Sequence, residues 1–364
     1  MGTPLTFDHQ SYGQRVVFGA GAARERLAGE VERLGARRVL LVAGRSALPL
    51  ADRLAERLPR AGTIDDVRMH VPLRTAEAAR RRAGEIRADL LLSIGGGSAT
   101  GMAKAIALTT GLPILAVPTT YAGSEATPVW GITDNGRKTT GVDERVLPRT
   151  VVYDPELTLE LPVGLSMASG LNALAHCVDS LWAPRANPVD TALALEGARS
   201  LAAGLPAVHG DPGGLDGRSQ LLYGAYLAAV SFAGAGSGLH HKICHVLGGT
   251  YDLPHAQTHA VVLPHVLAFN GPAVPEAEHR LAQALGPGGS ALAGLLGLYD
   301  AIQLTPRSLG ELGLAEKSIP EAAALVAEAA PPDNPRPVTV ADAEQLLRDA
   351  WAGQPAAGGE GNHP

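Results

Sequence analysis

The stretch that decides the fold is DLLLSIGGGSATGMAK, residues 89–104. Residues 89–94 form an apolar run, as expected of a strand buried on both faces. The turn that follows consists of Gly95, Gly96, Gly97 and Ser98, and a helical stretch begins directly after it. Glycines let the backbone approach an anion closely, and the first amides of a helix carry partial positive charge. This order predicts a pyrophosphate site, although for the glycines alone a tight turn is the simpler explanation.

A second polar loop favours the pyrophosphate site. Residues 113–117 form another apolar run, and PTTYAGSE, residues 118–125, comes directly after it. Open α/β sheets bind ligands at the carboxyl ends of their strands, so two such loops converge on one dinucleotide. The candidate cofactor residues in this loop are Thr119, Thr120 and Ser124.

Residues 1–155 alternate short apolar runs with amphipathic stretches. Further strands are expected at 38–43, 65–71 and 150–153, and helices at 22–35, 46–58 and 75–87. This rhythm predicts an α/β, doubly wound, dinucleotide-binding domain with a mostly parallel sheet. The FGAG motif at 18–21 lacks the third glycine of a nucleotide loop and is discounted.

Arg45 follows the strand at 38–43, where an acidic residue would bind a ribose 2′-hydroxyl and repel a 2′-phosphate. Because Arg45 does neither, NADH or NADPH is expected as the cofactor. A solvated loop residue is an equally good interpretation of Arg45.

Residues 156–352 have the pattern of an all-α domain. Helices are expected at 165–182, 188–203, 215–233, 239–247, 276–285, 290–303, 321–329 and 341–351. The tail, residues 353–364, is expected to be disordered.

The helical part contains a histidine-rich segment, GLHHKICHVLGGTYDLPHAQTHAVVLP, residues 238–264. His241 and His245 are four residues apart and share one face of a helix. After a Gly-Gly break, His255 brings back a third imidazole. Such clusters indicate metal or proton chemistry, whereas a lone histidine in an apolar helix is usually a core residue.

Composition excludes several classes of protein. The net charge of −6 argues against a nucleic-acid binder, which needs a basic face. Two cysteines in apolar surroundings fit a reducing cytoplasm, where we expect the protein. No apolar run is long enough to span a bilayer, so no membrane association is expected.

Four motifs resemble the iron-containing alcohol dehydrogenase superfamily. They are GGGSATGMAK (95–104), PTTYAGSE, the histidine segment and LPHVLAFN (263–270). The resemblance implies the dehydroquinate synthase-like fold, in which a dinucleotide-binding domain precedes an all-helical one. Within the superfamily, TTYAGSEATPVWGITD (119–134), KTTG (138–141), LPHAQTH (253–259) and NPRP (334–337) are similar to the maleylacetate reductases.

The resemblance also bears on a metal site. The four ligand positions of metal-dependent members match Asn172, His176, His241 and His255, so three imidazoles are present and the carboxylate is missing. A neutral amide is a poor substitute for a carboxylate on a hard divalent ion. We therefore expect no metal, although three histidines alone can hold zinc.

The reductase subgroup implies NAD(P)H-dependent reduction of maleylacetate, a dicarboxylic enone, to 3-oxoadipate, as in the degradation of hydroxyquinol, resorcinol or chlorocatechol. His241 and His255 are expected at the enolate oxygen, one of them as proton donor, with His176 and His245 in support. Further candidates are Tyr121 beside cofactor or substrate, and Lys138 and Lys242 for a carboxylate, with His240 and His259 behind them.

Several other interpretations stay open. They are a metal-dependent (Fe or Zn) alcohol dehydrogenase, a cyclase of the dehydroquinate synthase type, a non-enzymatic binding protein, and a relative that reduces another enone or ketone in biosynthesis. The resemblance implies a homodimer, completed by an N-terminal strand around residues 3–8.

Overall fold

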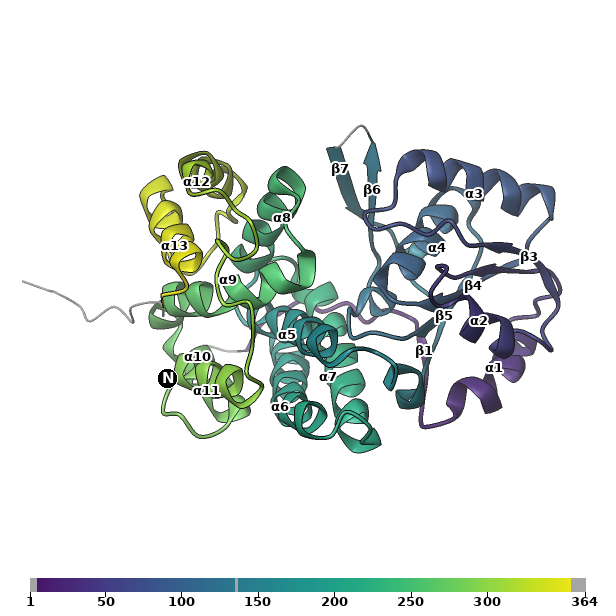
Figure 1. Cartoon of the computed structure of the whole chain (residues 1–364), viewed down its shortest axis with the longest axis horizontal. Coiled ribbons are helices and arrows are strands. Elements are labelled where there is room, and N and C mark those ends of the chain that lie inside the picture. Colours follow the sequence, from purple (N-terminus) through teal and green to yellow (C-terminus); the bar gives the residue numbers. More distant parts are fainter. Residues whose placement is uncertain (1–4, 135–136, 355–364) are drawn as a thin grey trace, which may run out of the picture. The chain divides into compact units, whose positions relative to one another are not determined.

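The computed structural model describes residues 5–134 and 137–354, and the chain divides into two compact units (Figure 1). The α/β unit contains residues 12–161 and 213–222, and the helical unit contains the other described residues. The division therefore falls after Leu161, six residues beyond the expected position at 155. The extra residues stay with the α/β unit because Leu157 packs against the core of its sheet.

The α/β unit contains a six-stranded sheet with the order β1-β8-β5-β4-β2-β3, and all its pairs are parallel. Its strands are β1 (Arg15–Phe18), β2 (Val39–Val42), β3 (Arg60–Ile64), β4 (Leu90–Gly95), β5 (Ile114–Pro118) and β8 (Thr150–Tyr153). Its helices are α1 (Ala22–Arg33), α2 (Leu48–Leu54), α3 (Leu73–Glu85) and α4 (Gly97–Thr110).

Alternation along the central strands gives the sheet an apolar core on each face. Leu41 and Leu92 pack with α1 and α2, while Leu40 and Leu91 pack with α3 and α4. Figure 1 shows these helix pairs on opposite faces of the sheet. Because every second side chain of a strand points to the same face, fully apolar strands require cover on both sides. The doubly wound fold expected from the sequence is confirmed.

Three parts of this unit differ from expectation. The strand expected at 65–71 is wrong: β3 is Arg60–Ile64, and His70 and Val71 have positive φ angles of 60° and 45°. As an edge strand β3 is partly exposed, so its sequence lacks an apolar run. β1 was not predicted, nor was the antiparallel hairpin of β6 (Val129–Asp134) and β7 (Arg137–Val142).

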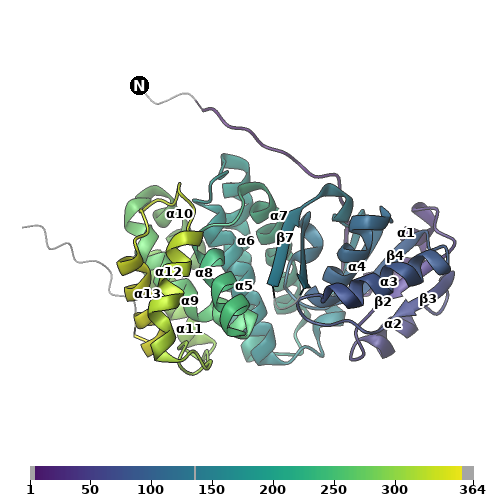
Figure 2. The same cartoon turned by 90° about the horizontal axis from the view of Figure 1, so that it is seen from above.

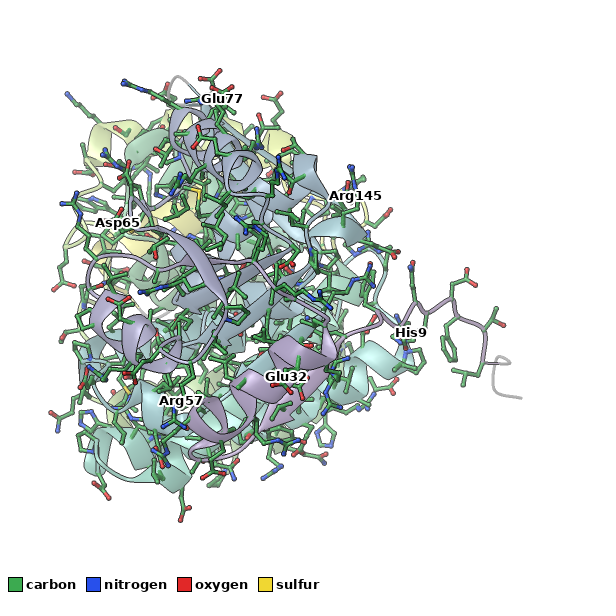
Figure 3. All side chains as sticks on the ribbon, turned by 90° about the vertical axis from the view of Figure 1, so that its right-hand side faces the viewer. His9, Glu32, Arg57, Asp65, Glu77 and Arg145 are labelled. Atoms are coloured by element: carbon green, nitrogen blue, oxygen red, sulfur yellow. The ribbon has the colours of Figure 1, made fainter. Side chains whose placement is uncertain are left out.

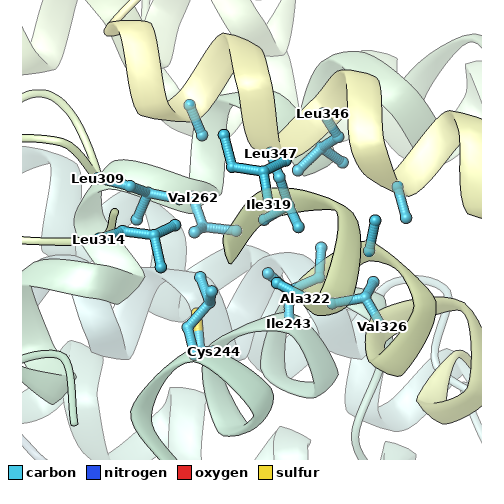
Figure 4. Packing of buried hydrophobic residues seen from close by; sticks show 14 of the residues in the cluster. Ile243, Cys244, Val262, Leu309, Leu314, Ile319, Ala322, Val326, Leu346 and Leu347 are labelled. Carbon is cyan, nitrogen blue, oxygen red and sulfur yellow. The ribbon is translucent and has the colours of Figure 1, made fainter. Parts of the chain in front are cut away.

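The helical unit is built around α5 (Val163–Ser180), α8 (Leu239–Tyr251) and α9 (His255–Asn270). The remaining helices are α6 (Pro188–Gly210), α7 (Leu215–Ala235, whose first residues belong to the α/β unit), α10 (Pro275–Leu285), α11 (Ala291–Ala301), α12 (Ile319–Ala329) and α13 (Val340–Ala352). Helices α8, α9, α12 and α13 enclose an apolar core that includes Ile243, Val262, Val326 and Leu347 (Figures 2 and 4).

Two boundaries in the histidine segment differ from expectation. Helix α8 continues through Gly248 and Gly249 to Tyr251, and it ends where Asp252 adopts a left-handed conformation with φ of 55°. Helix α9 was not predicted, and it begins at His255 directly after Pro254. The Gly-Gly pair therefore does not end the helix, because the surrounding helices stabilise the backbone there.

The two chain ends bear on two further expectations. Residues 5–8 have no regular secondary structure, and residues 3–4 lie outside the described part of the chain. Of the tail expected to be disordered, residues 353–364, only Gly353 and Gln354 lie within the described part of the chain. Among the described residues no single helix meets the length and apolarity of a membrane span; α7 and α8 meet them only together, with a bend of 99° between them.

Candidate functional site

A cavity of about 620 Å³ lies at the carboxyl ends of β2, β3 and β4 in the α/β unit. It is lined by residues 44–47, 65–69 and 95–99 and by Thr120. The structure thus brings together six of the predicted cofactor residues, namely Arg45, Gly95, Gly96, Gly97, Ser98 and Thr120. Thr119 and Ser124, the other two, are not among the lining residues.

Backbone geometry explains the glycine turn. Gly95 has a φ of 143°, which only glycine adopts without strain. A Cβ atom on Gly96 would lie 2.9 Å from Cγ2 of Thr120, so the two loops approach too closely for a side chain. The first residues of α4 line the cavity, and their backbone amides provide partial positive charge there. The cavity, the glycines and the helix terminus therefore fit the pyrophosphate of a dinucleotide.

A buried lysine anchors the segment directly after the PTTYAGSE loop. Nζ of Lys104 on α4 donates to the carbonyl oxygens of Thr127 and Val129, both at 2.7 Å. Burial lowers the pKa of Lys104 to about 7, although the nearby Glu125 opposes this. Burial raises the pKa of Glu125, whose Oε1 accepts a hydrogen bond from Tyr153 at 2.9 Å. These contacts hold the loop after β5 in one conformation.

Tyr121 belongs to the interior of the α/β unit. Its ring is fully buried, and its hydroxyl accepts a hydrogen bond from Nη1 of Arg218 at 3.1 Å. Arg218 is itself fully buried and donates to the carbonyl of Leu161. From the sequence, Tyr121 is expected to face cofactor or substrate; in the structure its hydroxyl accepts a hydrogen bond from a buried guanidinium.

Two acidic residues that line the cavity were not predicted from the sequence. Asp65 and Asp66 follow β3 and line the cavity, with Asp65 on the side of the unit that Figure 3 shows. Asp66 pairs with Arg68 at 2.8 Å. They were missed because residues 65–71 were assigned to a strand. Arg45 and Asp65 thus both line the cavity and carry opposite charges.

Backbone amides at the end of the FGAG motif and just after it bind a carboxylate of the protein itself. Gly21 N and Ala23 N each donate to a carboxylate oxygen of the buried Asp154 at 3.0 Å. The amides at the start of α1 are therefore already occupied by an internal carboxylate. Discounting this motif as a nucleotide loop agrees with that geometry.

In the helical unit, α5, α8 and α9 gather the candidate histidines around His241. The centroid of its ring lies 4.7 Å from those of His176 and His259, 5.3 Å from that of His240 and 6.2 Å from that of His245. Phe232 of α7 packs against His241 at 4.4 Å and against His176 at 4.7 Å. The ring of Phe232 therefore covers one side of the His176–His241 pair.

Asp179 on α5 holds His241 in place. Its Oδ2 atom lies 2.7 Å from Nδ1 of His241 and accepts hydrogen bonds from the backbone amides of Gly238 and His241. Asn172, His176 and Asp179 follow the i, i+4, i+7 spacing of one helix face. Asp179 was not predicted from the sequence, although this spacing places it on the same helix face as the candidate ligands Asn172 and His176.

Burial keeps the inner imidazoles neutral. It lowers the pKa of His176 and of His240 to about 3, with smaller contributions from neighbouring histidines. It also lowers the pKa values of His241 and His259 well below their usual range. Burial raises the pKa of Asp179 to about 7, against the effect of its backbone hydrogen bonds.

The remaining candidates are more accessible. His245 and His255 are exposed, and the ring centroid of His255 lies 4.5 Å from that of His259. Lys242 is half-buried on α8. Lys138 is exposed on β7 of the α/β unit, so the two lysines belong to different units.

Iron fits this donor set poorly. Oδ1 of Asn172, Nδ1 of His176 and Nε2 of His241 are buried and have no hydrogen-bond partner among the described residues. All three atoms are neutral donors, whereas Fe²⁺ sites built on histidine typically include a carboxylate. The amide of Asn172 removes that negative charge. These residues therefore do not match the iron site of the metal-dependent members.

Comparisons with known proteins cover both units. Residues 13–155 match the family described as iron-containing alcohol dehydrogenase, and residues 166–351 match the C-terminal part of that family. A maleylacetate reductase of Sphingobium indicum is 47% identical, over 96% of this chain and 99% of its own length.

Solved structures agree with this assignment. An iron-containing alcohol dehydrogenase of Corynebacterium glutamicum has a TM-score of 0.96 and 53% identity, covering 98% of this chain and 100% of its own. A maleylacetate reductase of Agrobacterium tumefaciens has a TM-score of 0.92 and 41% identity, with 96% and 99% covered. The chain therefore belongs to the iron-containing alcohol dehydrogenase family, within its maleylacetate reductase group.

Proposed function

We propose that this chain reduces maleylacetate to 3-oxoadipate with NADH or NADPH and without a metal. The observation that carries the proposal is its similarity, over nearly the whole chain, to enzymes named maleylacetate reductase. The cavity beside the glycine turn supports a nucleotide cofactor. The reduced nicotinamide supplies a hydride, and residues 95–98, Thr120 and Arg45 are proposed to hold the nucleotide.

The substrate explains why imidazoles suffice. Hydride adds to the alkene carbon β to the ketone, and the electron pair moves onto the ketone oxygen as an enolate. A proton added to the α-carbon then gives the saturated ketone. Conjugation already activates the acceptor, so a Lewis acid is less necessary than for an isolated carbonyl.

We assign His241 and His255 to the enolate, one of them as proton donor, because imidazoles supply protons and stabilise oxyanions near neutral pH. His255 is exposed and can regain its proton from water, while Asp179 holds His241. His176 and His245 support the cluster, and Lys138 and Lys242 are assigned to the substrate carboxylates.

The proposal also covers where the protein acts, in which kind of pathway and in which oligomeric state. We infer a cytoplasmic enzyme of aromatic-compound breakdown that acts as a homodimer on a small dicarboxylic enone. Neither a membrane nor a nucleic acid is proposed as a partner, in keeping with the net charge of −6.

The decisive experiment measures NADH and NADPH oxidation with maleylacetate, with and without a chelator, and with added Fe²⁺ or Zn²⁺. We expect turnover that needs maleylacetate and is unchanged by the chelator. Activity on simple aldehydes that disappears with chelator and returns with metal would instead identify a metal-dependent alcohol dehydrogenase. Measured metal content of the purified protein provides the control.

A further inference from the structure

We propose that Asp179 is a positioning residue of the reaction, which engages Nδ1 of His241 so that Nε2 is the nitrogen that serves the substrate. The inference rests on the proposed function, because it specifies how His241 takes part. It concerns a residue outside the sequence-predicted site.

Both carboxylate oxygens of Asp179 have hydrogen-bond partners. Oδ2 lies 2.7 Å from Nδ1 of His241, 3.1 Å from the amide nitrogen of Gly238 and 3.2 Å from that of His241. Oδ1 accepts a longer bond, 3.4 Å, from the amide of His240. Asp179 is fully buried, so these contacts replace water around it.

The backbone is shaped around this carboxylate. A Cβ atom on Gly238 would lie 2.5 Å from Oδ1 of Asp179, so only glycine leaves room for it there. The first turn of α8 begins at Leu239, and its amides point at the carboxylate as they would at a capping residue. The ring of His241 and the helix that carries it are thus fixed by the same group.

The two ring nitrogens of His241 therefore differ in role. A hydrogen-bonding partner on one nitrogen of an imidazole determines the tautomer and directs the other nitrogen to its task. Nδ1 is engaged by Asp179, whereas Nε2 has no hydrogen-bond partner among the described residues. To act as the proton donor, His241 first takes up a second proton from water at Nε2 and becomes an imidazolium whose Nδ1–H faces Asp179. It then gives the Nε2 proton to the enolate, which leaves a lone pair on Nε2, and the Nδ1–H bond to Asp179 persists.

A purely structural role would make Asp179 no more than the cap of α8. The two roles predict different results for the imidazole itself. A cap supports the first turn whichever nitrogen of His241 carries the proton, whereas a positioning residue determines that nitrogen. The tautomer of His241 is therefore the measurement that separates them.

The test uses the full chain labelled with ¹⁵N-histidine, at mildly alkaline pH. The His241 signals are assigned by comparison with His241→Gln, and the ¹⁵N shifts report which nitrogen is protonated. We expect the wild type to carry its proton on Nδ1. Asp179→Asn keeps the side-chain shape but offers an amide donor, so we expect the proton to move to Nε2. We also expect kcat with maleylacetate to fall about 10- to 100-fold with little change in KM.

Asp190→Asn is the matched control, because Asp190 is another buried carboxylate of the helical unit, at the start of α6, with Asn187 as its partner. We expect this variant to retain the wild-type tautomer of His241. A wild-type His241 protonated only on Nε2 would overturn the proposal without any variant. So would an Asp179→Asn protein that loses activity with its tautomer unchanged, or one that changes tautomer and keeps its kcat. If the wild type does not reduce maleylacetate at all, the proposed function fails while the tautomer result still stands.

Discussion

Nε2 of His240 lies 2.8 Å from Nδ1 of His259, so two fully buried imidazoles on α8 and α9 share a hydrogen bond. Both histidines have pKa values lowered by burial, and a neutral pair satisfies one donor and one acceptor. The pair lies beside His241 and joins the two helices that carry the candidate catalytic histidines. It has consequences for stability that can be measured.

The first prediction concerns stability and pH. The folded-state pKa of His240 is about 3, whereas an unfolded histidine has a pKa of about 6.5. Between these values the unfolded chain binds the extra proton, so the free energy of unfolding falls as pH is lowered from neutral. His240→Asn should reduce the slope of that free energy against pH by an amount that grows to about 1.4 kcal/mol per unit as pH approaches 5. Urea titrations of both proteins between neutral pH and pH 5 measure it, and parallel slopes would contradict the assignment.

The second prediction concerns the exposed end of the cluster. His255→Ala should lower kcat with maleylacetate about 100-fold, because the enolate loses a proton donor. His279→Ala is the control: His279 is also exposed, on the neighbouring helix α10. Steady-state rates and thermal melting of both variants provide the comparison. A folded His255→Ala protein with wild-type rates would show that His255 is not catalytic.

The third prediction restores the missing carboxylate. Asn172→Asp should bind Zn²⁺ or Fe²⁺ at least about tenfold more tightly than the wild type, because a charged oxygen replaces a buried neutral one. The unpaired carboxylate should also lower the melting temperature in chelator, and added Zn²⁺ should restore it. Calorimetric titration and melting curves test this, with Asn172→Ala as the uncharged control. Equal metal affinities in the two variants would count against it.

The fourth prediction concerns cofactor choice. Arg45→Glu should lower kcat/KM for NADPH relative to NADH by about 10- to 100-fold, since a 2′-phosphate loses a charged hydrogen bond worth roughly 1.5–3 kcal/mol. Arg57→Glu makes the same charge change at another exposed position of the α/β unit. Initial rates with both cofactors decide the matter. An unchanged ratio would place Arg45 outside the ribose site.

The fifth prediction concerns the two cofactor loops. Gly96→Ala should raise the KM for NADH about tenfold or more, because its Cβ would lie 2.9 Å from Cγ2 of Thr120 and displace the loop. Adding Thr120→Ser removes that methyl group and should recover part of the affinity. Cofactor titrations of the single and double variants test the contact. No recovery in the double variant would mean that Gly96 matters for another reason.

The strands, the glycine turn and the helix face that the sequence predicted are those formed by interactions between residues close together in the chain. The apolar runs of β4 and β5 identified buried parallel strands, because such strands have no solvated face. The glycines at 95–97 marked a turn that other residues cannot form, and His241 with His245 identified one face of a helix. β3 was misplaced, because an edge strand is partly exposed and needs no apolar run.

Taken by itself, the sequence determined the doubly wound unit, the helical unit, the glycine turn and the histidine-rich segment at 238–264, because each depends on patterns of residues close together in the chain. Only the tertiary structure decided that Asp179 engages His241, 62 residues away, and that Asp65 and Arg45 line the same cavity. Such pairs form when separate helices or strands pack together. The spacing of side chains along one helix or strand does not indicate which residue of another helix or strand they contact.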